Sequence, residues 1–199
     1  MAQQFDPARR RLLGAGVIVL GGGLSFEQAF AQQLSPTPQC QDGDAATVRQ
    51  GEGPFYKPRS PQRADLVEKA SKARLVELSG QVLSRSCQPV AGALVDLWHS
   101  DERGDYDTAG FRYRGHVLTD ASGNYRFRTI LPALYPGRTR HYHFKVQAPT
   151  RSSLTTQLYF PADEAANRRD GLFRGELLMR VADAGDGLAA RFDFILDMR

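Results

Sequence analysis

The chain has 199 residues, of which 41% are hydrophobic and 24% are charged, and its formal net charge is +4 at pH 7. This length and composition favour one globular domain with a sizeable core, and they exclude a low-complexity or repetitive protein. Because the net charge is modest and the basic residues are scattered, we expect no nucleic-acid partner.

Residues 1–31 have the layout of a bacterial export signal. The three arginines at 9–11 precede the weakly apolar run LLGAGVIVLGGGL, and Ala-Phe-Ala at 29–31 supplies small residues for cleavage. The apolar run is too short to span a bilayer comfortably, so we expect no stable membrane anchor after processing. The paired arginines and the glycine-rich core resemble a twin-arginine signal, with an ordinary secretory signal as the alternative. We therefore predict an exported protein, either periplasmic or secreted.

Export would place the two cysteines of the chain, Cys40 and Cys87, in an oxidising compartment. We predict a disulfide between them that ties the N-terminal segment to the first strands. The alternative is a pair of buried free thiols. Two cysteines alone make a poor metal site, so neither is assigned to a metal.

Residues 32–73 are rich in Gln, Pro, Gly and Asp and contain the stretch GEGPFYKPRSPQR. The prolines at positions 54, 58 and 61 exclude regular structure there. We predict an extended N-terminal arm that lies over a domain formed by residues 74–199.

This domain consists of short segments rich in Val, Leu, Phe and Tyr, separated by turns with Gly, Asp and Pro. The expected strands are 75–83, 93–100, 113–119, 124–131, 141–148, 154–160, 176–181 and 191–196. Such a set predicts an all-β fold, mainly an antiparallel β-sandwich or barrel. In the stretch YRFRT, alternation predicts that Tyr125, Phe127 and Thr129 share one face. A helix is expected only within residues 161–173, and a glycine near its end shortens it.

Two histidines in one expected strand, His141 and His143, are candidate metal ligands. Residues at i and i+2 point to the same face of a strand and lie roughly 6–7 Å apart at the backbone. Two imidazoles at this spacing can converge on one metal ion, but the same spacing is common on exposed strands. The identity of the site therefore depends on the neighbouring residues.

The sequence offers two ways to complete the ligand set. The first adds Tyr106 and Tyr135, because two phenolates and two imidazoles would hold Fe(III) firmly. The second uses His99 and Asp101 with a later histidine, as in the 2-His-1-carboxylate site of Fe(II) oxygenases. A third interpretation is a secreted, non-enzymatic β-sandwich binding module whose histidines lie on an ordinary sheet face.

Four stretches together resemble the intradiol ring-cleavage dioxygenases, the family that includes protocatechuate 3,4-dioxygenase and catechol 1,2-dioxygenase. In chain order, they are EGPFYKPRSPQRADL, VAGALVDLWHSDERGDYD, GHVLTDASGNYRFRTILPALYPGRTRHYHFKV and TTQLYF. The specific motifs are Trp-His with a tyrosine eight residues after the tryptophan, Tyr-Pro before a strand, and His-x-His within that strand.

The resemblance implies one non-haem Fe(III) ion per chain, held by Tyr106, Tyr135, His141 and His143. It further implies that O2 cleaves the ring of a catechol-type substrate between its two hydroxyl carbons, giving a cis,cis-muconate-type diacid. Relatives in this family usually form homo-oligomers, and the sequence leaves the oligomeric state open.

The resemblance also assigns catalytic roles. Tyr135 would leave its ligand position and accept a substrate proton, Arg138 would place positive charge beside the reacting ring, and Gln157 would line the same pocket. The loop between Tyr135 and His141 is shorter than in the well-studied members, and Arg140 stands where a proline is common. An export signal is also unusual in this family, which suggests a subgroup that works outside the cytoplasm.

Overall fold

The computed structural model describes residues 40–41 and 45–198, so the expected export signal at 1–31 lies outside the described residues. Within the described ranges, no helix has the length and apolar character needed to cross a membrane. The strands are β1 (Leu75–Ser84), β2 (Leu94–Trp98), β3 (Arg114–Leu118), β4 (Asn124–Ile130), β5 (His141–Gln147), β6 (Leu154–Tyr159), β7 (Arg180–Ala184), β8 (Gly187–Arg191) and β9 (Phe194–Leu196). The short helical segments are η1 (Pro161–Asp163), α2 (Glu164–Arg169) and η2 (Gly175–Leu177).

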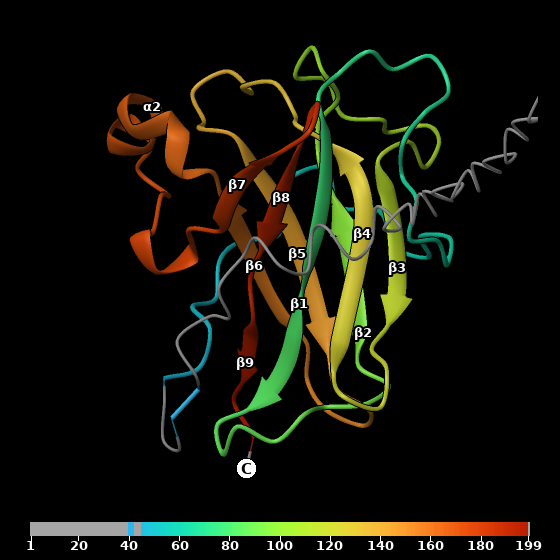
Figure 1. The fold of residues 1–199 in the computed structure, drawn as a ribbon, viewed down its shortest axis with the longest axis vertical. Helices are drawn as coiled ribbons and strands as arrows, with labels where there is room; N and C mark the ends of the chain where they lie inside the picture. The colour runs from blue at the N-terminus through green and yellow to red at the C-terminus, as the bar shows by residue number, and fades with distance from the viewer. Residues whose placement is uncertain (1–39, 42–44, 199) are drawn as a thin grey trace, which may run out of the picture.

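The strands form two sheets that face each other (Figure 1). The larger sheet has the order β4-β1-β8-β7, with β9 also paired to β1, and the smaller sheet has the order β3-β2-β5-β6. Neighbouring strands are antiparallel except that β1 runs parallel to β8 and to β9. The predicted all-β sandwich is therefore confirmed, although its larger sheet is mixed.

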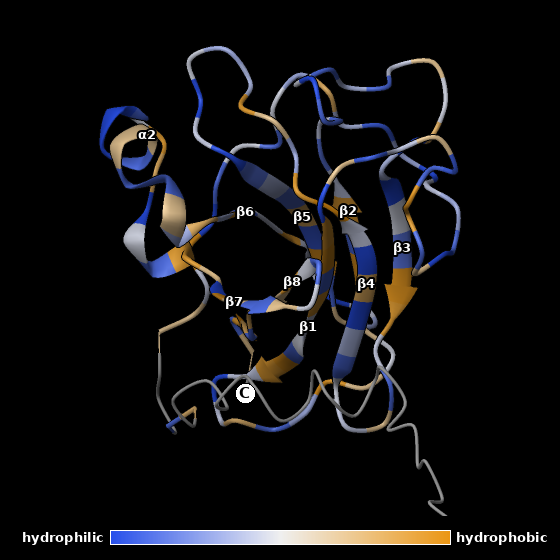
Figure 2. Ribbon diagram, turned by 45° about the horizontal axis from the view of Figure 1, so that its top comes forward, coloured by the Kyte–Doolittle hydropathy of each residue, from blue (hydrophilic) through white to orange (hydrophobic). Residues whose placement is uncertain are grey.

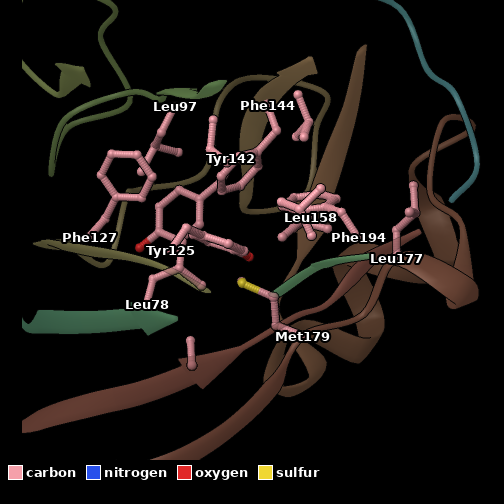
Figure 3. Packing of buried hydrophobic residues seen from close by; sticks show 14 of the residues in the cluster. Leu78, Leu97, Tyr125, Phe127, Tyr142, Phe144, Leu158, Leu177, Met179 and Phe194 are labelled. Atoms are coloured by element: carbon pink, nitrogen blue, oxygen red, sulfur yellow. The ribbon is translucent and has the colours of Figure 1, made fainter. Parts of the chain in front are cut away.

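The core lies between the two sheets and is filled by alternate residues of each strand. On β4, Tyr125, Phe127 and Thr129 are 3%, 0% and 0% exposed while the residues between them reach outward, as the sequence predicted. Figure 2 shows this alternation of hydropathy along the strand. In Figure 3, Phe127 of the larger sheet lies near Leu97 and Phe144 of the smaller one. Full burial of one such side chain contributes roughly 1.5–3 kcal/mol.

The smaller sheet has a second face that is turned away from the core, and this face carries the histidine pair. Tyr142 and Phe144 of β5 enter the core, so the alternate residues His141 and His143 point to the opposite side. Residues 45–73 cover this face and contain no helix or strand apart from isolated bridges. Together with the loops between strands, they leave the two histidines only 4% and 3% exposed.

The C-terminal part differs from the expected strand pattern. The strand expected at 176–181 begins as the 3-10 turn η2 and becomes β7 only at Arg180. The strand expected at 191–196 contains β9 but shares only Arg191 with β8. β8 was missed because its sequence, GLAAR, has little intrinsic strand preference, and its place between β1 and β7 decides its structure. The helix expected within 161–173 is the short α2, which ends before Gly171.

The predicted disulfide is present between Cys40 and Cys87, with 5.5 Å between the Cα atoms. It ties the N-terminal segment to the turn that follows β1. The alternative of two free thiols is therefore wrong.

Candidate metal centre

One row of side chains crosses the outer face of the smaller sheet and forms the floor of the candidate site. Trp98 on β2 is the Cα partner of Arg114 on β3 and of His143 on β5, and His143 is the partner of Gln157 on β6. Paired residues of a sheet point to the same side, so these four side chains lie next to one another. The indole of Trp98 also stacks on the His143 imidazole, with 5.0 Å between centroids and 8° between planes.

Three donor atoms converge above this row. The Nε2 atoms of His141 and His143 are 3.1 Å apart, and the hydroxyl oxygen of Tyr106 lies 3.3 Å from His141 Nε2. The histidines come from β5, whereas Tyr106 comes from the loop between β2 and β3. Two segments far apart in sequence therefore present their donor atoms to a common point.

The protonation state of the histidines suits metal binding. Burial lowers the pKa of His141 to about 4 and also lowers the pKa of His143 well below its usual value, so both rings are neutral at pH 7. His141 Nδ1 lies 2.6 Å from the Thr139 carbonyl oxygen, which can only accept. Nδ1 therefore carries the proton, and the lone pair of Nε2 is free to bind a metal.

The two tyrosines lie side by side near the histidines. The ring centroids of Tyr106 and Tyr135 are 5.8 Å apart in an edge-to-face arrangement, and Tyr135 comes from the loop between β4 and β5. Burial raises the pKa of the Tyr106 phenol, so this group stays protonated unless a cation at the point of convergence stabilises the phenolate. The structure thus brings Tyr106 and His143 into contact with His141 and places Tyr135 beside Tyr106.

The N-terminal arm closes the site from above. Gly53 adopts a φ of +74°, and a Cβ atom at this position would lie 3.2 Å from His143 Cε1. Phe55 stacks on Tyr106, with centroids 4.5 Å apart and planes 12° apart, and meets Tyr135 edge-on. The arm therefore restricts water access and holds the tyrosine rings in place.

Arg138 and Gln157 are in contact, as members of one pocket should be. Arg138 donates from Nη2 to Gln157 Oε1 at 2.6 Å and from Nε to Asp170 Oδ2 at 2.8 Å. Asp170 also accepts hydrogen bonds from the backbone N–H groups of Thr139 and Leu172. The guanidinium is consequently fixed from two sides.

Three further residues of the site were missed by sequence reasoning: Phe55, Arg114 and Asp170. Arg114 is 1% exposed, donates from Nε to the Asp107 carbonyl, and has no partner for its terminal nitrogens in the part of the chain that the structure describes. It places a fixed positive charge near Tyr106 that lowers the pKa of that phenol, opposing the effect of burial. An arginine in a short strand suggests a solvent-exposed side chain. Only the strand register, which pairs Arg114 with Trp98, places it at the site.

The second ligand set considered from the sequence is not assembled. Both ring nitrogens of His99 are engaged, Nδ1 with the Ser100 carbonyl and Nε2 with Thr129 Oγ1, each at 2.7 Å. Asp101 instead accepts backbone N–H groups of its own turn. Among the described residues, no group of three or more His, Cys, Asp or Glu could hold a metal ion. The two tyrosines remain the candidate ligands beside the histidine pair.

A β-sandwich that gathers two histidines and two tyrosines on the outer face of one sheet has the architecture expected of an intradiol-type dioxygenase. Comparison with known proteins agrees, because a family model for dioxygenases matches residues 51–198. The chain is 30% identical over 186 residues to catechol 1,2-dioxygenase 2 of Acinetobacter lwoffii, an alignment that covers 77% of this chain and 68% of that protein.

Solved structures give the same result. The dioxygenase domain of a dioxygenase–carbohydrate-binding protein fusion from the cellulolytic bacterium Streptomyces sp. SirexAA-E is 49% identical, with a TM-score of 0.75, covering 78% of this chain and all of that one. Catechol 1,2-dioxygenase from Pseudomonas arvilla C-1 is 29% identical, with a TM-score of 0.68, covering 76% of this chain and 62% of that one. The chain therefore belongs to the intradiol ring-cleavage dioxygenase family, as the motifs predicted. It spans between 56% and 68% of the length of the catechol 1,2-dioxygenases from Acinetobacter and Pseudomonas that it matches.

Proposed function

We propose that this protein is a non-haem Fe(III) dioxygenase that cleaves a catechol-type ring between its two hydroxyl-bearing carbons, giving a cis,cis-muconate-type diacid. Both atoms of O2 enter the product and one carbon–carbon bond breaks, so no reductant is consumed. The observation that carries the proposal is the convergence of Tyr106 and His143 on His141, whose Nε2 atom lies 3.3 Å from the Tyr106 hydroxyl and 3.1 Å from His143 Nε2.

The residues present fit ferric iron. Two neutral imidazoles and two phenol oxygens match the preference of this ion for nitrogen and hard anionic oxygen ligands, and the ligands would be Tyr106, Tyr135, His141 and His143. When bound, ferric iron would stabilise the deprotonated diol and make the ring reactive towards O2.

Three side chains of the protein would accept the substrate proton, stabilise the developing negative charge and position the group that does so. Tyr135 is half-buried on a loop, whereas Tyr106 is held against Phe55, so Tyr135 is the tyrosine we expect to move and accept a substrate proton at its phenolic oxygen. Arg138 would place its fixed guanidinium beside the ring, where negative charge develops. Gln157 would hold this guanidinium in position.

The proposal is tested on protein purified after expression in iron-replete medium. We expect about one iron per chain, a visible absorption band from tyrosinate coordination, and uptake of one O2 per catechol with formation of a ring-opened diacid, detected by an oxygen electrode and mass spectrometry. Colourless, metal-free protein that consumes no O2 would instead support a binding module.

Substitution of Gly53 tests whether the arm holds the metal site in shape. Gly53→Ala should lower iron retention and thermal stability, because the left-handed backbone costs a non-glycine residue roughly 1–2 kcal/mol and the added methyl group presses on His143. Gly51→Ala is the matched control, since a Cβ atom there would meet nothing within 4 Å. Equal iron content after dialysis and equal melting temperatures in the two variants would contradict this role of the arm.

We also infer that the protein acts outside the cytoplasm. The layout of residues 1–31 and the Cys40–Cys87 disulfide support this inference, because such bonds persist in oxidising compartments. Recovery of the native protein from the cytoplasmic fraction of its bacterial host would contradict it.

A further inference from the structure

A hollow of about 440 Å³ is lined by residues of the β4–β5 loop and of α2 with the residue that follows it. Its volume falls within the roughly 300–1,000 Å³ that is typical of small-molecule sites. Two of its lining residues, Tyr135 and Arg138, are also residues of the candidate active site. The hollow and the candidate active site therefore share two side chains.

The hollow exists because the loop is short and leaves α2 uncovered. Only five residues separate Tyr135 from His141. Gly137, on this loop, has open space where a Cβ atom would be, with no atom within 4 Å. The segment that carries α2 is held at the loop by the Arg140–Asp163 ion pair at 2.6 Å. Both walls are thus fixed to the fold.

One wall of the hollow is apolar. It includes Pro136 and Leu134, and the side chain of Leu134 is 46% exposed although it is large and hydrophobic. Leu134 therefore offers exposed apolar surface in this wall, which an apolar part of a substrate can cover.

The other wall provides one unpaired cation. The carboxylate of Asp170 is fully used by Arg138 and by two backbone N–H groups. Arg169, in the last turn of α2, lines the hollow, is exposed, and forms no ion pair with any residue that the structure describes. Its neighbour Arg168 is instead paired with Glu164 at 3.4 Å. The hollow therefore suits an apolar stem that ends in an anion.

We propose that the preferred substrates are catechols whose ring carries an apolar side chain of a few carbons ending in a carboxylate, and that Leu134 and Arg169 recognise this side chain. The inference rests on the proposed ring cleavage and names the substrate class of that site. Leu134 contacts the stem, and Arg169 pairs with the carboxylate.

The test compares kcat/KM for three probes: catechol, 3-(3,4-dihydroxyphenyl)propanoic acid and the methyl ester of this acid. We expect the iron-loaded wild type to prefer the acid over the ester. Arg169→Gln should reduce the acid-to-ester ratio about three- to fivefold, the size expected of a partly exposed ion pair. The matched control is Arg168→Gln, which removes the same charge one residue earlier and should leave the ratio unchanged.

Reversing the charge at Arg169 tests whether this residue attracts the substrate side chain through opposite charge. Arg169→Glu should reduce the acid-to-ester ratio further and should raise the relative kcat/KM for 4-(2-aminoethyl)catechol, which carries a cation in place of the carboxylate. Equal rates for acid and ester in the wild type, or the same change in both Gln variants, would overturn the inference while catechol cleavage upholds the proposed function. Failure to cleave all probes would overturn the proposed function and the inference with it.

Discussion

Tyr106→Phe and His143→Ala should each abolish iron retention, the visible absorption band and ring cleavage together. The Nε2 atom of His141 lies 3.3 Å from the Tyr106 hydroxyl and 3.1 Å from His143 Nε2 in a buried site, so each substitution removes an expected ligand that no neighbouring group replaces. Loss of a direct ligand should exceed the roughly 10- to 100-fold loss of metal affinity that follows removal of a residue supporting a ligand. Metal content by elemental analysis and the visible spectrum measure this effect directly.

A histidine on the same face of the sheet provides the control. His116 lies on β3, but its Nδ1 is 3.1 Å from Ser60 Oγ rather than at the metal centre. His116→Ala should retain iron, colour and turnover within a fewfold of the wild type. Full iron content in Tyr106→Phe and His143→Ala, or its loss in His116→Ala to the same degree, would refute the ligand assignment.

Local pattern in the sequence was sufficient to predict the strands that carry the site. The first six observed strands begin and end within two residues of the expected bounds, because each contains β-branched residues, four of them contain Phe, Tyr or Trp as well, and turn residues separate them. Alternation along β5 also predicted that His141 and His143 share a face. It did not reveal whether this face is buried or exposed to solvent, because a buried pair of histidines and an exposed pair have the same spacing.

The remaining parts of the site depend on contacts between segments far apart in the chain. Arg114 reaches the site only because β3 pairs with β2 in a register that places it beside Trp98. Phe55 lies in an arm without regular structure, and Asp170 follows a short helix whose sequence resembles an ordinary surface turn. Neither segment has a period that predicts a position in space. The residues of the sequence offered Tyr106 and Tyr135 as one of two ligand sets and the family resemblance selected them, whereas no signal identified Phe55, Arg114 or Asp170.

The outer face of the smaller sheet explains how one fold can provide both stability and chemistry. The inward residues of β5 pack into the apolar core, whereas its outward residues hold the donor atoms under the arm. A substitution at His143 therefore changes the site without opening a cavity in the core, which is why metal content and folding can be measured separately in the variants described above.

Arg138→Ala should keep iron and colour while kcat falls by about two to three orders of magnitude. This is the loss expected when a positioned charge that stabilises the transition state is removed. The guanidinium does not contribute a ligand atom, and it is fixed by Asp170 and Gln157 before substrate arrives, so its charge needs no reorganisation during the reaction. Single-turnover rates of ring cleavage, measured at equal iron occupancy, give the magnitude.

Two further variants separate the position of this charge from its presence. Arg140→Ala removes an equal charge from the same loop, but this guanidinium is bound by Asp163 and the Pro132 carbonyl and not by Gln157 or Asp170, so turnover of unsubstituted catechol should stay within a fewfold of the wild type. Asp170→Asn retains Arg138 but weakens the ion pair that holds its guanidinium. A displacement of this guanidinium by about 1 Å would lower kcat by up to about 100-fold, with the iron content unchanged. Equal turnover in Arg138→Ala and Arg140→Ala would show that the site responds to net charge alone. An unchanged kcat in Asp170→Asn would show that Gln157 is sufficient to position the guanidinium.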